Sequence, residues 1–274
     1  MLSGESLFAL IALLLVCGAA AGLIAGLLGV GGGIILVPAM VFVLDFQGVA
    51  DRVSMHMAVA TSLAVIVTTA MSSARAHWRR GGIDKAIARR WIPAMACGAL
   101  GGALLARLIS GDLLRIAFAL LAIIIGLKFL RGQRPQPTRH RPVPGPAQQL
   151  GIASGIGALS AWLGIGGGSL SVPVLQALGL SVHRAVGTSS LLGLAIAIPA
   201  TLGFIAAGYS IADRPPGSLG YVYAPAAATL AVTAALLAPV GARLAHSLDQ
   251  IRLKQVFGIF LLMAGLRVAL KVMS

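Results

Sequence analysis

The stretch Gly29-Val-Gly-Gly-Gly33-Ile-Ile-Leu-Val-Pro38 occurs a second time, as Gly164-Ile-Gly-Gly-Gly168-Ser-Leu-Ser-Val-Pro173. A second motif follows each copy in the same order: His56-Met-Ala-Val-Ala-Thr61-Ser62 and His183-Arg-Ala-Val-Gly-Thr188-Ser189. Two ordered matches of this length indicate that the chain contains two copies of one unit. Each unit carries a glycine-rich break.

The composition of the surrounding chain is that of a membrane protein. Its 274 residues are 58% apolar and only 10% charged, whereas soluble proteins carry about 45–50% apolar and about 25% charged residues. About ten spanning or partly spanning helices fit this length. We attribute the net charge of +14 to basic cytoplasmic loops, not to binding of nucleic acid.

The apolar runs predict an all-α polytopic membrane protein with about five hydrophobic segments in each repeat. A linker rich in Pro and Arg, residues 131–149, separates a first repeat (1–130) from a second (150–274). The expected segments are 6–28, 34–44, 54–74, 91–110, 113–130, 148–163, 169–180, 187–207, 220–242 and 253–272.

The loop charges predict that the two repeats are inverted relative to each other. Residues 75–90 contain six basic side chains, whereas the equivalent loop, 208–219, has only Arg214 beside Asp213. The positive-inside rule places the first loop in the cytoplasm and the second outside. Both termini are then outside and the linker is cytoplasmic. A model with eight or nine spans and a different parity stays open.

Each glycine break is expected to interrupt a helix. Three consecutive glycines cost about 1 kcal/mol each relative to Ala, and Pro38 and Pro173 remove a further backbone hydrogen bond. Because broken backbone in a bilayer must face protein or water, we expect discontinuous or re-entrant half-helices whose N-termini lie near the midplane. Such N-termini bind anions through free N–H groups. Close helix packing is the alternative explanation for the glycines.

The predicted substrate-binding residues lie at the two breaks and in the segments that follow them. They are Gly31, Gly32, Gly33, Thr61, Ser62, Trp162, Gly166, Gly167, Gly168, Ser169, Gln176, His183, Thr188 and Ser189.

Each of the polar candidates also has a purely structural interpretation. Ser and Thr can bond the preceding turn of their own helix, and His can sit at the membrane interface. Trp162 can pack between helices with its N–H on a carbonyl. Trp162, Ser169, Ser171 and Gln176 have apolar counterparts in the first half, so we expect the second break to determine specificity.

Other chemistries find little support in the sequence. No carboxylate lies in the middle of an apolar run, which argues against a buried carboxylate relay. His pairs at metal-binding spacing, CxxC motifs, a complete P-loop and a GxSxG elbow are all absent from the sequence. We therefore expect no catalytic residue, no metal and no cofactor. No Arg or Lys is evident deep in a span.

The chain resembles the sulfite exporter family, TauE/SafE. The resemblance is carried by Gly22-Leu-Ile-Ala-Gly-Leu-Leu-Gly-Val-Gly-Gly-Gly33 with Pro38, by Gly164-Ile-Gly-Gly-Gly168 with Pro173, and by His183-Arg-Ala-Val-Gly-Thr-Ser189. It implies a multi-pass permease of the bacterial inner membrane that exports sulfite or a small organosulfonate such as sulfoacetate. Some members are linked to uptake of related compounds.

The expected partners are a small anionic substrate and membrane lipid, with no nucleic acid, and the sequence leaves a homodimer open. Two alternatives to a secondary transporter stay open as well. An anion channel would share the anion-attracting features and would be revealed by single-channel currents. An intramembrane enzyme would require Ser189 to react with a serine-directed probe.

Overall fold

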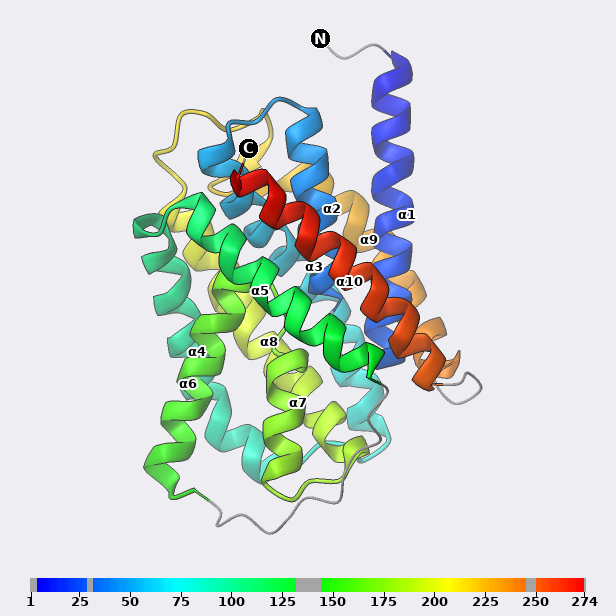
Figure 1. Cartoon of the computed structure of the whole chain (residues 1–274). Helices are drawn as coiled ribbons and strands as arrows, with labels where there is room; N and C mark the ends of the chain where they lie inside the picture. Colours follow the sequence, from blue (N-terminus) through cyan, green and yellow to red (C-terminus); the bar gives the residue numbers. More distant parts are fainter. Residues whose placement is uncertain (1–3, 29–31, 132–143, 245–249, 274) are drawn as a thin grey trace.

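The computed structural model describes residues 4–28, 32–131, 144–244 and 250–273, and they form a bundle of α-helices (Figure 1). The helices of the first half are α1 (Gly4–Leu28), α2 (Gly33–Phe46), α3 (Asp51–Arg79), α4 (Lys85–Leu105), the short 3-10 helix η1 (Ala106–Leu108) and α5 (Gly111–Leu130). Those of the second half are α6 (Pro146–Leu163), α7 (Gly168–Ala177), α8 (Val182–Ala207), α9 (Ala224–Leu244) and α10 (Gln250–Met273).

The prediction of an all-α polytopic membrane protein is confirmed. Within the described ranges, seven helices contain stretches long and apolar enough to cross a membrane. The sheet structure there consists of one small hairpin, β1 (Ser218–Leu219) paired with β2 (Val222–Tyr223). Each of the ten predicted segments corresponds to one α-helix. Helices α4 and α8 begin earlier than predicted and α3 ends later, because these helices extend into polar residues that hydropathy leaves out.

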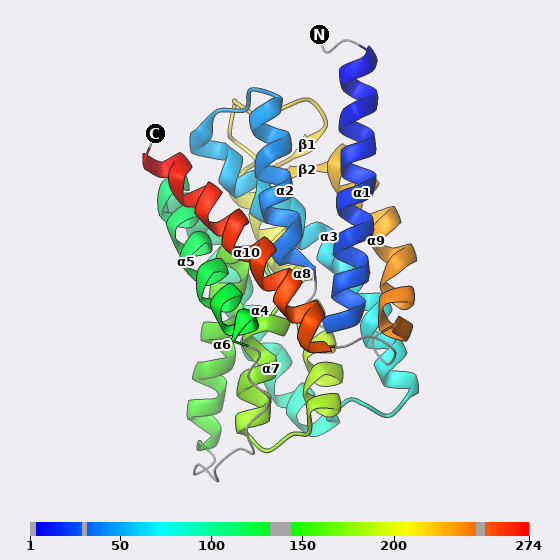
Figure 2. The same ribbon diagram turned by 45° about the vertical axis from the view of Figure 1, so that its right-hand side comes forward.

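Helices of one half pack mainly against helices of the other half. Helix α1 packs on α9, and its counterpart α6 packs on α4, the counterpart of α9. Helix α3 packs on α8, and α5 on α10, so these pairs join equivalent helices (Figures 1 and 2). Helix α1 begins at the top of Figure 1 and α6 at the bottom, so the two run in opposite senses. This arrangement supports the inverted repeat, which stays a prediction.

Small residues set the closest of these contacts, at equivalent positions in both halves. A Cβ on Gly22 of α1 would lie 2.3 Å from the Ala234 carbonyl oxygen, and one on Gly157 of α6 would lie 2.3 Å from that of Met95. Lipid tails are as apolar as the helices, so helix association in a bilayer depends on such close packing. Helices α1 and α6 are therefore held by equivalent contacts in the two halves of the chain.

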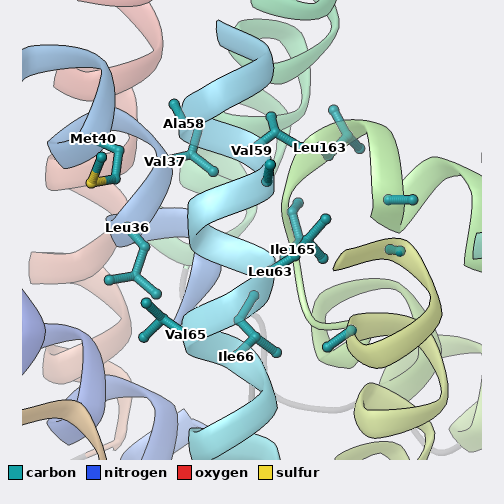
Figure 3. Close-up of a cluster of buried hydrophobic side chains, with 14 of the residues drawn as sticks. Leu36, Val37, Met40, Ala58, Val59, Leu63, Val65, Ile66, Leu163 and Ile165 are labelled. Atoms are coloured by element: carbon teal, nitrogen blue, oxygen red, sulfur yellow. The ribbon is translucent and has the colours of Figure 1, made fainter. Parts of the chain in front are cut away.

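The centre of the bundle is the pair α3 and α8. Of the candidate spans, α3 is the most deeply buried, with 83% of its apolar window inside the protein. Figure 3 shows its side chains Val59, Leu63 and Ile66 between α2 on one side and the second glycine break on the other. Both breaks are thus positioned by α3.

We expect Gly157→Ala to destabilise the protein by about 1–3 kcal/mol, because its methyl group would overlap the Met95 carbonyl. The matched control is Gly155→Ala on the same helix, where a Cβ meets nothing within 4 Å. That variant should be neutral or slightly stabilising, since Ala is the better helix former. Thermal unfolding in detergent measures both; equal unfolding temperatures for the two variants would contradict the packing account.

Candidate functional site

The backbone conformation at the two breaks requires glycine. Gly32 precedes α2 with φ 72°, and Gly167 precedes α7 with φ 71°, both in the left-handed region. Helix α6 ends at Gly164, which has φ 65°. A side chain is disfavoured in this region, and Gly is the residue that adopts it routinely. The prediction of two interrupted helices is therefore confirmed for the described residues; Gly31 lies outside them.

The two breaks contact each other at the core of the bundle. A Cβ on Gly33 would lie 2.2 Å from the carbonyl oxygen of Gly164, so the first turn of α2 rests directly on the second break. Ser62 of α3 donates a hydrogen bond to that same oxygen at 2.8 Å. Close packing, the alternative explanation for the glycines, is therefore observed at this contact.

The second break is the more polar of the two. The hydroxyls of Ser171 on α7 and Ser189 on α8 are fully buried and have no hydrogen-bond partner in the part of the chain that is described. The hydroxyl oxygens of Ser160 and Ser169 are also buried without a partner. Buried polar groups are normally satisfied. The unpaired hydroxyls on α6, α7 and α8 are therefore candidate donors to an acceptor that the described residues do not supply.

Backbone donors lie at the same place. The N–H groups of Gly168 and Ser169, the first two of α7, have no hydrogen-bond partner among the described residues. The Ser171 hydroxyl oxygen is 3.6 Å from where a Cβ on Gly167 would lie, so it is close to the residue that precedes α7. A helix N-terminus with free N–H groups attracts an anion. The arrangement can bind a small oxyanion through N–H and O–H donors.

Thr61 and Thr188 each make a backbone contact that the sequence did not predict. The Thr61 hydroxyl accepts the backbone N–H of Tyr223 at 3.0 Å, immediately before α9. The Thr188 hydroxyl accepts the N–H of Asp84 at 2.8 Å, immediately before α4. Each threonine therefore ties its own half to the start of a helix in the other half. The recurrence of the motif is explained by this exchanged contact.

Three further predicted residues do not present free polar groups to the N-terminus of α7. Trp162 donates its indole N–H to the carbonyl of Gly102 at 2.7 Å, which fixes α6 to α4. Gln176 lies in the last turn of α7, about 12 Å along the helix from Gly168 at 1.5 Å per residue. His183 is exposed at the start of α8. The break itself includes Gly166, whose carbonyl packs against Gly193.

A buried arginine escaped prediction. Arg115, in the second turn of α5, is 1% exposed and pairs with Asp51 at 2.9 Å and with Asp112 at 3.0 Å. It also donates to the Ser54 hydroxyl at 2.7 Å. A buried cation requires such partners. Arg115 and its partners lie at the end of the bundle away from the linker, and they are remote from the second break.

A sequence signal for Arg115 exists, in a third internal match. Leu114-Arg-Ile-Ala-Phe118 corresponds to Leu253-Lys-Gln-Val-Phe257, which places a cation near the start of α5 and of α10.

Within the described ranges, no three His, Cys, Asp or Glu side chains gather as a metal site requires.

Comparison with known proteins identifies relatives that are membrane transporters by name. The family model described as sulfite exporter TauE/SafE matches residues 14–268. A probable membrane transporter protein of Haemophilus influenzae is 32% identical over 266 residues, which cover 97% of this chain and 100% of the relative. The Bacillus subtilis protein YunE, also named a probable membrane transporter, is 29% identical over 65% of this chain and 71% of its own length.

We expect Thr61→Val to lower stability by about 1 kcal/mol, because the Tyr223 N–H loses its acceptor. Thr61→Ser keeps the hydroxyl and should stay near the parent protein. Neither change should alter the substrate concentration for half-maximal flux by more than about two-fold, since the threonine is tied to α9 and not to the break. Thermal unfolding and vesicle flux measure the two effects. A stable Thr61→Val protein with strongly weakened substrate binding would contradict this assignment.

Proposed function

Because this chain belongs to the sulfite exporter TauE/SafE family of membrane transporters, we propose that it moves a small sulfur oxyanion across the bacterial inner membrane and binds it at the second glycine break. Sulfite and organosulfonates such as sulfoacetate share a compact, negatively charged group of three oxygens. Each oxygen accepts hydrogen bonds and donates none. The site therefore needs donors and a positive potential.

The observation that carries this proposal is the set of donors without acceptors at the N-terminus of α7. The N–H groups of Gly168 and Ser169 and the hydroxyls of Ser171 and Ser189 are available. The partial positive charge of the helix N-terminus adds to them. The carboxylates that form ion pairs, such as Asp51 and Asp84, lie at helix ends. An anion at the break thus meets donors and little repulsion.

The packing of the breaks favours a transporter over an open channel. Gly33 rests on the Gly164 carbonyl, and we interpret this contact between the two halves as an occluded state. Alternating access requires such an occluded state, and it opens the site when one repeat moves against the other. Export is the direction that we propose. Single-channel currents carried by the purified protein would favour the channel instead.

We expect Ser171→Ala and Ser189→Ala each to raise the KM for labelled sulfite or sulfoacetate in proteoliposomes by roughly ten-fold or more, because each removes a hydrogen bond to a charged group. Both proteins should stay folded, and their stability should hold or rise, since an unpaired buried hydroxyl is removed.

The matched control is Ser190→Ala, one residue away. Its hydroxyl donates to the Gly187 carbonyl at 2.7 Å within α8 and is not available to a ligand. The KM of this variant should change by less than about two-fold. If Ser171→Ala and Ser189→Ala are stabilised but transport every sulfur anion as the parent does, the second break is not the binding site.

A further inference from the structure

A cleft opens at the linker end of the bundle, where the loop between α3 and α4 meets the start of α8. It encloses about 420 Å³ and is lined by Trp78, Ile83, Asp84, Lys85 and Arg184, among others. The Lys85 ammonium lies 5.1 Å from the centre of the Trp78 ring. Two cations and the face of an aromatic ring therefore border one cleft.

The wall of this cleft is in direct contact with the helix that carries Ser189. The Asp84 N–H donates to the Thr188 hydroxyl at 2.8 Å, and a Cβ on Gly187 would lie 2.2 Å from the Gly82 carbonyl. The loop thus lies on the first two turns of α8. Thr188, which holds the loop, is adjacent to Ser189.

One of the two cations of the cleft, Arg184, is already paired with a carboxylate of the protein. Asp84 pairs with Arg184 at 3.0 Å through one oxygen, while its other oxygen accepts the N–H groups of Ala86 and Ile87 at the start of α4. Asp84 is 17% exposed and Arg184 is 55% exposed, so the guanidinium is accessible from water. A carboxylate on Arg184 takes the place that an incoming oxyanion would take.

The opposite end of the bundle has no such arrangement at the equivalent positions. The internal matches pair Arg184 with Met57, Asp84 with Tyr223 and Lys85 with Ala224. All three replacements are uncharged, although the Thr-to-backbone contact is the same at both ends. The cleft therefore breaks the symmetry of the two halves. It gives the end with the basic loop, which the positive-inside rule assigns to the cytoplasm, a feature that attracts anions.

We propose that this cleft is a loading site for the transported oxyanion, in which Arg184 and Lys85 bind the anion and Asp84 competes with it for Arg184. The inference rests on the proposed function, because it assigns the entrance to the site at the second break. The basic cleft would raise the local concentration of the anion, and its rate of loading, at the entrance on the basic side.

Flux of labelled sulfite loaded from the basic side of oriented vesicles tests this directly. Arg184→Gln should raise the KM roughly ten-fold, because a charge-assisted contact is lost. Asp84→Asn should lower it several-fold, since Asn caps a helix as well as Asp does and leaves Arg184 free. The double variant should behave as Arg184→Gln alone, because Asp84 has then no cation to compete for.

The control is Arg89→Gln, which removes an exposed cation from the same end but outside the cleft. Its KM should change by less than about two-fold. Equal effects of Arg89→Gln and Arg184→Gln would mean that only the overall charge matters. That result, or a raised KM in Asp84→Asn, would overturn the loading site.

A binding measurement separates this inference from the proposed function. Sulfite added to the protein in nanodiscs of uncharged lipid should change the emission of Trp78, with Trp78→Phe as the blank, and Asp84→Asn should respond at lower concentration. This response without any flux would support the cleft and refute transport of sulfite. A response to phosphatidylglycerol and none to sulfite would assign the cleft to a lipid headgroup and overturn the inference.

Discussion

The contact between the first turn of α2 and the carbonyl of Gly164 is the constraint on which the rest of the structure depends. Two helices are broken near the centre of a bundle in lipid, and their freed backbone groups must be satisfied inside the protein. Gly33 allows the approach, and Ser62 donates to the same carbonyl at 2.8 Å. The donors of α7 are left over, and they are the groups that an anion can use.

The two copies of the repeated unit share their scaffold contacts but differ in their polar residues. Equivalent threonines tie each half to a helix of the other, and equivalent glycines hold α1 on α9 and α6 on α4. Symmetry alone would give two equal sites and no direction. Differences in the second half, Ser169 and Ser171 at the break and Arg184 at the cleft, make that break more polar and add a cation at the cleft. Both proposed sites lie where the copies differ.

The sequence predicted the helical architecture well, because hydropathy and glycine spacing are local properties. It predicted the second break as the polar one from Ser169 and Ser171, which the structure leaves with buried, unpaired hydroxyl oxygens. It could not predict the partners of Thr61 and Thr188, since a hydroxyl contact depends on which helix packs beside it. The burial of Arg115 was missed because it depends on Asp51 and Ser54 of α3 as well as on Asp112 of its own helix, and hydropathy does not reveal that α3 lies beside it.

We propose that the N-terminus of α7 binds the transported oxyanion, and anomalous scattering from bound selenite, the selenium analogue of sulfite, tests this binding most directly. The account predicts one selenium peak within hydrogen-bonding distance of the Gly168 N–H and the Ser171 hydroxyl, and its loss in Ser171→Ala. Selenite that competes with sulfite for transport but gives its only peak elsewhere would contradict the account.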